Sequence, residues 1–166
     1  MLPLLSGSAT VRSGVRLGVD VGSVRVGVAR SDPGGVLASP LEMIAHSRAD
    51  IDRLAGLVAG HDALEVIVGL PTTLAGREGP AAAAARQVAS ALAARIAPVP
   101  VRLFDERFTT TTAHAVLRQS GKDSRARRQI VDQAAAAVLL QAALDAERAT
   151  GHPPGELVVI PGCVAG

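Results

Sequence analysis

Several residue types are scarce in this sequence, and each shortage excludes a class of protein. Cys163 is the single cysteine among 166 residues, so the chain cannot form an internal disulfide. Only 1% of the residues are aromatic, so the core must be aliphatic, and the hydrophobic fraction of 48% suffices for one. No apolar run approaches the roughly 20 residues that a membrane span needs, and Met1–Ser13 lacks the order of a secretory signal. We therefore expect a cytoplasmic protein without a membrane partner.

Lysine is nearly absent, and the basic residues that are present cluster. The net charge of only +2 excludes a polybasic tail but allows a local basic surface. No aromatic residue is interleaved with the cluster, so base stacking and sequence readout should be weak there. A solvated surface loop is the alternative to a phosphate-binding surface. The predicted nucleic-acid contacts are Lys122, Arg125, Arg127 and Arg128 in the cluster, with Arg25 and Arg107 outside it.

The hydrophobic pattern predicts an α/β domain with a central, mixed, five-stranded sheet flanked by helices. The first three strands should form an antiparallel meander, and the next two should be short, buried and parallel. The predicted strands are 15–21, 24–30, 36–38, 65–70 and 101–104, and the predicted helices are 50–59, 81–96, 109–117 and 129–148. We expect residues 1–14 to form a flexible lead-in, 15–148 the domain, and 149–166 a flexible tail that begins near two prolines.

One acidic residue lies in a segment that is apolar on nearly every face. This residue is Asp132, within the run Ile130–Leu144. Such a helix is normally buried, and an ionised carboxylate in a dry interior is costly unless it is paired or binds a metal. An ion pair with Arg127 or Arg128 is the alternative, although that arginine would also lose its hydration. We therefore predict that Asp132 meets a cation or further metal ligands.

Two other acidic residues lie where strands end. Asp20 is near the end of the first predicted strand and is followed by Gly22, which allows a close backbone approach. Asp105 and Glu106 directly follow the last predicted strand. A turn at Asp20 and a helix cap at either later acid are the alternatives. Adjacent residues point in different directions, so we predict that Glu106 faces the site and that Asp105 supports it.

Three carboxylates from two strand ends and a helix would form a site for a hard cation. Mg²⁺ and Mn²⁺ prefer oxygen ligands, and two such ions about 4 Å apart can promote phosphodiester hydrolysis. We predict Asp20, Glu106 and Asp132 as the catalytic and metal-binding residues of a nuclease. Asp20 would lie between the two ions, Glu106 and Asp132 would each bind one of them, and Arg25 or Arg107 would contact the phosphate.

Four sequence blocks occur in order across residues 15–147, and together they are specific. The first holds Asp20, the third holds Glu106 with Phe108 in place of a more usual Leu, and the fourth begins at Asp132. In this pattern the chain resembles the YqgF family, also called RuvX, of proposed pre-16S rRNA nucleases. The blocks are Leu17–Ala29, Val66–Pro71 with Gly76 and Glu78–Pro80, Asp105–Thr110, and Asp132–Ala136.

The resemblance implies a ribonuclease H-like fold related to Holliday-junction resolvases. It implies a nuclease that matures the 5′ end of 16S rRNA in the cytoplasm, with a metal site at Asp20, Glu106 and Asp132. Those resolvases often carry a further acid one helical turn from the last one. Here that position is Ala135, so three carboxylates must suffice.

Three other functions compete with an rRNA nuclease. A resolvase of four-way DNA junctions would need a symmetric dimer, and the sequence allows either a monomer or a homodimer. An actin-like or sugar-kinase ATPase would need two such domains, and 166 residues provide one. A non-catalytic RNA-binding assembly factor would have no use for clustered carboxylates, because they repel phosphate.

Overall fold

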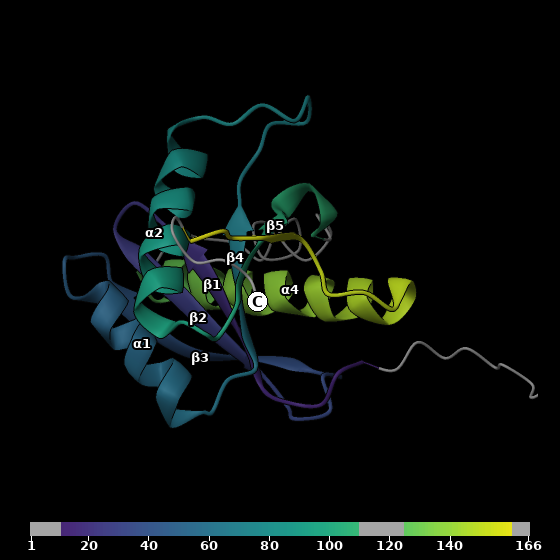
Figure 1. The fold of residues 1–166 in the computed structure, drawn as a ribbon. Helices are drawn as coiled ribbons and strands as arrows, with labels where there is room; N and C mark the ends of the chain where they lie inside the picture. Colours follow the sequence, from purple (N-terminus) through teal and green to yellow (C-terminus); the bar gives the residue numbers. More distant parts are fainter. Residues whose placement is uncertain (1–10, 110–124, 161–166) are drawn as a thin grey trace, which may run out of the picture.

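A computed structural model describes residues 11–109 and 125–160 of the chain, with the backbone alone for 125–133. A six-stranded sheet lies at the centre, with α1 and α2 on one face and α4 on the other (Figure 1). None of the described helices is long and apolar enough to cross a membrane. The elements are β1 (Arg16–Val21), β2 (Arg25–Ser31), β3 (Ala38–Ala45), α1 (Asp50–Gly60), β4 (Glu65–Leu70), α2 (Pro80–Ile96), β5 (Val101–Asp105), the 3₁₀ turn η1 (Glu106–Phe108), α4 (Arg125–Thr150) and β6 (Glu156–Leu157).

The sheet has the predicted mixture of strand directions. Its order is β3-β2-β1-β4-β5-β6, with an antiparallel meander in β1–β3 and parallel pairing of β1 with β4 and of β4 with β5. Because β1, β4 and β5 are parallel, their carboxyl ends meet at one edge of the sheet. Asp20 of β1 and Glu106, which begins η1 directly after β5, therefore lie at the same edge of the sheet.

Two strands differ from the prediction. The third strand was expected at 36–38 but spans Ala38–Ala45, because the preceding turn is longer than its Pro-Gly-Gly sequence indicates. The carboxylate of Asp32 accepts hydrogen bonds from the backbone N–H groups of Gly34, Val36 and Leu37, which holds the turn through residue 37. The sixth strand, β6, was not predicted; it pairs antiparallel with β5. The boundaries of the lead-in and the tail stay a prediction.

Each face of the sheet has its own core. The face under α1 and α2 buries mostly aliphatic side chains, including Val19, Val68 and Leu92. The face under α4 is smaller and lets the helix approach closely, because Gly18 has no side chain there. A Cβ on Gly18 would lie 2.8 Å from Cβ of Leu140 and 3.1 Å from the carbonyl oxygen of Ala136. Glycine at this position therefore sets how near α4 lies to β1.

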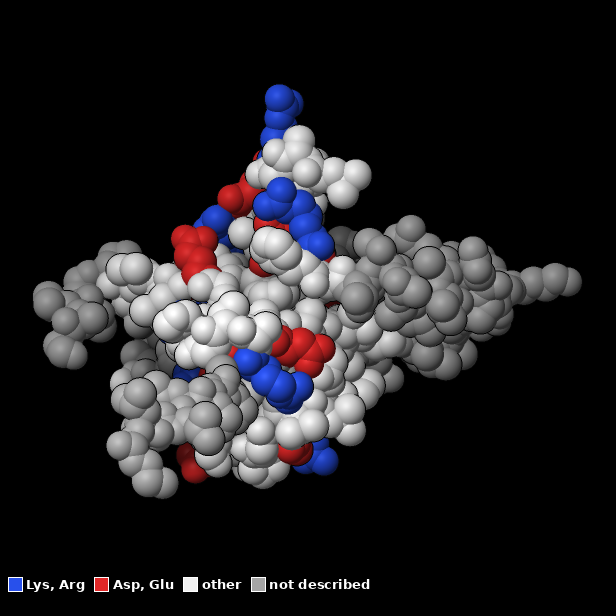
Figure 2. Space-filling view, turned by 90° about the vertical axis from the view of Figure 1, so that its right-hand side faces the viewer, with Lys and Arg blue, Asp and Glu red and all other residues white. Residues whose placement is uncertain are grey.

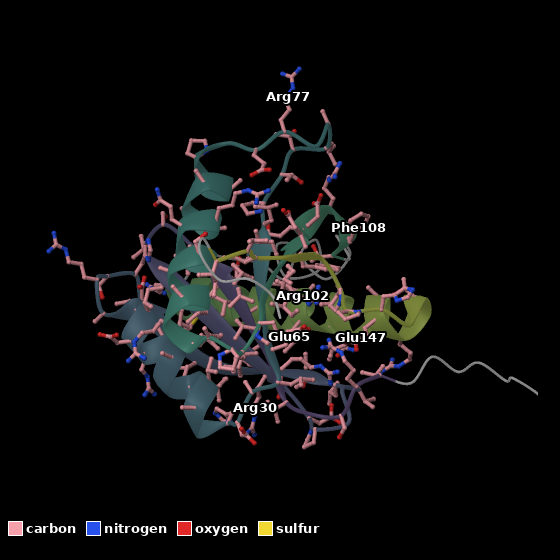
Figure 3. The ribbon with its side chains drawn as sticks, viewed as in Figure 1. Arg30, Glu65, Arg77, Arg102, Phe108 and Glu147 are labelled. Carbon is pink, nitrogen blue, oxygen red and sulfur yellow. The ribbon has the colours of Figure 1, made fainter. Side chains whose placement is uncertain are left out.

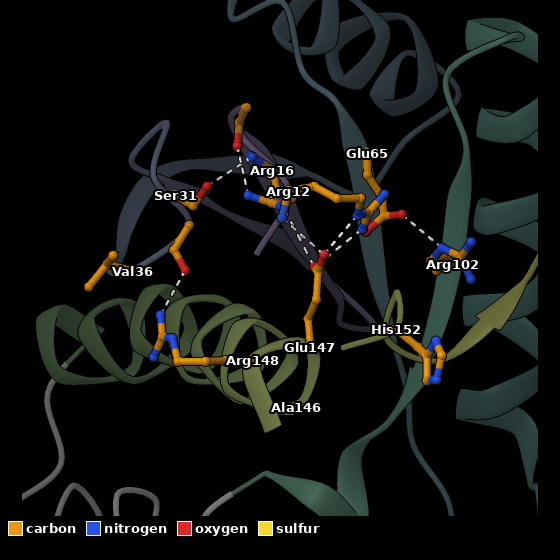
Figure 4. Close-up of polar contacts among 12 residues, drawn as sticks. Arg12, Arg16, Ser31, Val36, Glu65, Arg102, Ala146, Glu147, Arg148 and His152 are labelled. Carbon is orange, nitrogen blue, oxygen red and sulfur yellow. Dashed lines mark hydrogen bonds and ion pairs between the residues drawn. The ribbon is translucent and has the colours of Figure 1, made fainter. Parts of the chain in front are cut away.

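A network of buried charges fastens the C-terminal part of α4 to the sheet (Figure 4). Glu147 of α4 accepts a hydrogen bond from Nε of Arg12 at 2.7 Å and contacts Arg16 at 3.5 Å. Glu65, at the start of β4, accepts from Arg12 at 2.9 Å and from Arg102 of β5 at 2.7 Å. Glu65 and Glu147 are almost fully buried, and removing one side of such a buried ion pair is strongly destabilising. The network fixes the axial position of α4, and with it the position of residue 132.

Candidate active site

Two of the three predicted metal ligands come together in the structure. Asp20 lies next to the last residue of β1, and Glu106 is the first residue of η1, directly after β5. Although β4 separates their strands, the two side chains share a hydrogen bond. The sheet alternation directs Asp20 to the same face as Gly18, which is the face that α4 covers.

The surroundings of Glu106 disfavour its ionised form. Burial is the largest cause, and the charge of Asp20 and the hydrogen bond shared with it add to the effect, with a smaller contribution from Asp105. Together they raise the pKa of Glu106 to about 7. Protonated Glu106 can donate its hydrogen to Asp20, whereas two ionised carboxylates would repel one another. The pair therefore needs either a proton or a cation.

A glycine in β4 makes room for the Glu106 carboxylate. A Cβ on Gly69 would lie 2.7 Å from Oε1 of Glu106 and 3.0 Å from Cδ2 of Leu139 on α4. Both distances are too short for any larger residue unless the neighbours move. Gly69 therefore lets Glu106 lie flat across β4 toward Asp20. The glycine that directly follows the β-branched residues 66–68 of β4 is a sequence signal from which this close approach could have been predicted.

Asp105, which was predicted to support the site, accepts hydrogen bonds from neighbouring residues. Arg107 donates to it from Nη2 at 2.6 Å, Nε at 2.9 Å and the backbone N–H at 2.9 Å. The hydroxyl of Thr72 donates to it at 2.8 Å. The hydrogen bonds from Arg107 lower the pKa of Asp105 to about 2, so this carboxylate stays ionised. The role of Thr72 had no signal in the sequence.

The remaining predicted residues are placed only in part. Asp132 lies in α4 one helical turn before Ala136, whose backbone contacts the Gly18 position, but its side chain is outside the described residues. Arg25 begins β2 at the same end of the sheet as Asp20, on the face shared with Gly27 and Ala29. Among described side chains, no three His, Cys, Asp or Glu residues form a cluster that could hold a metal.

The basic cluster is placed at the start of α4. Arg125, Arg127 and Arg128 lie in the first turn of this helix, and their side chains, like all of Lys122, are outside the described residues. The helix begins four residues earlier than the predicted residue 129. Arg107, predicted as a phosphate contact, is ion-paired with Asp105, and its guanidinium lies against Gly76.

The sequence matches the RuvX family, described as Holliday junction resolvase, over residues 14–146. The chain belongs to the RuvX family. A relative from a Nocardioides species is 56% identical over 153 residues, covering 89% of this chain and 98% of the relative. A relative from Thermobifida fusca is 58% identical over 155 residues, which again cover 89% of this chain and 98% of the relative. Both are provisionally named pre-16S rRNA nucleases. These names all describe cleavage of nucleic-acid phosphodiester bonds, so this RuvX chain belongs to a family of ester-bond hydrolases.

The fold of this RuvX chain is also found in a solved junction resolvase. RuvC of T. thermophilus, solved in complex with a Holliday junction substrate, aligns with a TM-score of 0.56 at 16% identity. The alignment covers 85% of this chain and 99% of RuvC. At that identity the likeness establishes the fold and nothing more. It confirms the predicted ribonuclease H-like architecture, with β6 as one strand more than predicted.

Proposed function

We propose that this protein is a metal-dependent nuclease that acts in 5′-end maturation of pre-16S rRNA in the cytoplasm. The observation that carries the proposal is the hydrogen-bonded pair of Asp20 and Glu106 at the carboxyl edge of the sheet. The names of the relatives support rRNA as the substrate. Asp20, Glu106 and Asp132 are the proposed catalytic residues, and Asp132 is carried by α4.

The donor set fits a hard divalent cation, Mg²⁺ or Mn²⁺. Both described ligands are carboxylates, which supply the oxygen atoms that these ions prefer. Glu106 takes up a proton near neutral pH when no other cation neutralises the pair, which is the behaviour of a cation site. When bound, the metal would stabilise negative charge on the phosphate and lower the pKa of water.

The chain itself orients the two carboxylates and the substrate. Gly69 leaves the space in which Glu106 reaches Asp20. Asp105 accepts three hydrogen bonds from Arg107 and one from Thr72, which fixes the backbone just before Glu106. Arg25, at the same sheet end, is the proposed phosphate contact, and the basic residues at the start of α4 extend that contact along the backbone. The protein would act as a monomer or a homodimer.

The first prediction concerns Asp20. Asp20→Asn keeps the size of the side chain but removes the charge that binds the cation, so cleavage should stop while the fold remains. We would incubate both proteins with a pre-16S rRNA 5′-leader fragment and with a four-way DNA junction, in Mn²⁺, in Mg²⁺ and in EDTA. Circular dichroism checks the fold. Cleavage by a clean preparation of Asp20→Asn would contradict the assignment.

The same assay separates the two alternative functions. Cleavage of the junction alone would favour a resolvase. This second candidate is suggested by the description of the RuvX family and by the solved RuvC complex. RNA cleavage that requires both metal and Asp20 would support the rRNA nuclease. No cleavage of either substrate would favour a non-catalytic RNA-binding assembly factor.

A further inference from the structure

The connection between β4 and α2 is a small hairpin that projects from the edge of the sheet where the acidic pair lies (Figure 1). Thr72 and Glu78 form an antiparallel bridge at its base. The N–H of Thr73 donates to the carbonyl of Arg77 at 2.9 Å, and the N–H of Gly76 donates to the carbonyl of Thr73 at 2.8 Å. Gly76 has a φ of +80°, which suits glycine. The hairpin, residues 72–78, is thus an ordered structure.

The tip of the hairpin carries an apolar and a basic side chain that face outward. Leu74 is 96% exposed, the largest value among the exposed large hydrophobic residues of the described chain. Arg77 stands at the top of the molecule in Figure 3 and has no ion pair with another described residue. Figure 2 shows basic side-chain atoms at the top of this projection, with acidic and basic side chains mixed below them. Leu74 could be buried, and Arg77 could form an ion pair, only in contact with another molecule.

Two contacts join the hairpin to the residues that flank Glu106, and a third joins it to α2. Thr72 donates to Asp105, the residue directly before Glu106, at 2.8 Å. The position of a Cβ on Gly76 is 3.2 Å from Nη1 of Arg107, the residue directly after it. Glu78 pairs with Arg86 of α2 at 2.6 Å. The hairpin is therefore held against Asp105 and Arg107, the two residues that flank Glu106.

We propose that the hairpin is a wedge that binds the end of a double-stranded segment of the substrate, next to the bond that is cleaved. Leu74 packs on the last base pair, and Arg77 contacts a phosphate of the adjoining strand. Apolar side chains that enter a base step are a known means of unstacking it, and they act together with basic contacts to the backbone. The proposal rests on the proposed nuclease function and names its substrate: a fork or branch, in preference to a continuous duplex.

Binding without cleavage tests the wedge. In the Asp20→Asn background, we would measure the affinity for a forked RNA with 2-aminopurine in its last base pair, for a continuous duplex and for a single strand. The parent should bind the fork about tenfold more tightly than either comparator, with a rise in 2-aminopurine fluorescence. Leu74→Ser should lose both the preference and the rise. Arg77→Gln should weaken fork binding about three- to tenfold and lower the salt dependence by about one phosphate contact.

Two matched control variants lie far from the hairpin. Val159→Ser changes another strongly exposed apolar residue, and Arg30→Gln changes an exposed arginine at the opposite end of the molecule (Figure 3). Both should bind like the parent. If Leu74→Ser and Arg77→Gln also bind all three RNAs like the parent, the proposal of a wedge is contradicted. The tip of the hairpin would then be a better candidate for binding a protein partner. Because the readout is binding, this result leaves the test of cleavage at Asp20 unaffected.

Discussion

Glu106 is stabilised in its protonated form, and this has a consequence for folding. Its pKa is raised to about 7, so the folded protein binds more protons than the unfolded chain between about pH 4.5 and pH 7. Stability without metal must therefore fall as the pH rises through that window. At neutral pH the ionised carboxylate pair would therefore destabilise the folded protein unless a cation bound to it.

Replacing Glu106 should remove this cost. Glu106→Gln resembles the protonated side chain, so the metal-free variant should be more stable than the parent at pH 8, by about 2 kcal/mol after allowance for partial solvent exposure. At pH 4 the two should unfold alike. Urea unfolding in EDTA at both pH values measures the difference. Equal stability at pH 8 would mean that the acidic pair is not strained.

Gly69 offers a separate test of the same geometry. Gly69→Ala places a Cβ within 2.7 Å of the Glu106 carboxylate, so that carboxylate must shift away from Asp20. Mn²⁺ affinity and cleavage should each fall about tenfold, with overpacking against Leu139 costing about 1–2 kcal/mol of stability. Calorimetric titration with Mn²⁺ measures the first effect.

Gly56 provides the control for Gly69→Ala. A Cβ on Gly56, in the middle of α1, would meet no atom within 4 Å. Gly56→Ala should therefore raise stability by about 0.5–1 kcal/mol and leave Mn²⁺ binding unchanged. If Gly69→Ala also left binding unchanged, Glu106 would not need the space above β4.

At the residue scale, the sequence predicted which acidic side chains lie near one another better than it predicted the contacts that hold them. Asp20 and Glu106 could be paired because each lies at the end of an apolar strand, and the carboxyl ends of parallel strands share one edge of the sheet. The contact of Asp105 with Thr72 was not identifiable, since Thr72 lies 33 positions away and no local pattern connects the two. Glu147 was also missed, although it lies on an apolar helix just as Asp132 does.

At the scale of the elements, the position of α4 on the sheet depends on the buried charge of Glu147. Glu147 is 3% exposed and binds Arg12 and Arg16, so Glu147→Ala would leave the buried guanidinium of Arg16 without this acidic partner and Arg12 with Glu65 alone. We expect a loss of about 3 kcal/mol in the free energy of unfolding. Asp145→Ala, on the exposed side of the same helix, should change stability by less than about 0.5 kcal/mol. Urea unfolding compares them, and equal effects would argue against the network as the anchor of α4.

The elements that sequence patterns located well are those with strong periodicity. β4 and α2 match their predicted ranges to within one residue, because each has a sustained apolar pattern and α2 begins at Pro80. β3 was misplaced because it is an edge strand with mixed exposure. β6 was not predicted, because two exposed residues carry no pattern. The fold class was therefore predictable, whereas the edges of the sheet were not.

At the scale of the whole molecule, metal binding should stabilise the fold. A ligand at about 100 times its Kd adds about 2.7 kcal/mol, which for a chain of this size raises Tm by about 5–10 °C. Thermal melts in Mn²⁺ and in EDTA should show this rise for the parent protein. Asp20→Asn should show little rise. A similar rise in both proteins would place the stabilising ion somewhere other than the acidic pair.

The charge network in Figure 4 joins residues from opposite ends of the chain, Arg12 and Glu147. During synthesis Arg12 is made 135 residues before Glu147. Until the final turns of α4 have emerged, β1 and β4 are present but Arg12 lacks one of its two buried partners, and the helix that carries position 132 is not yet fastened. Asp132, the proposed third ligand, therefore joins the acidic pair only after the end of α4 has been made. A growing chain, surrounded by ribosomal RNA, would complete its proposed catalytic site only at that point.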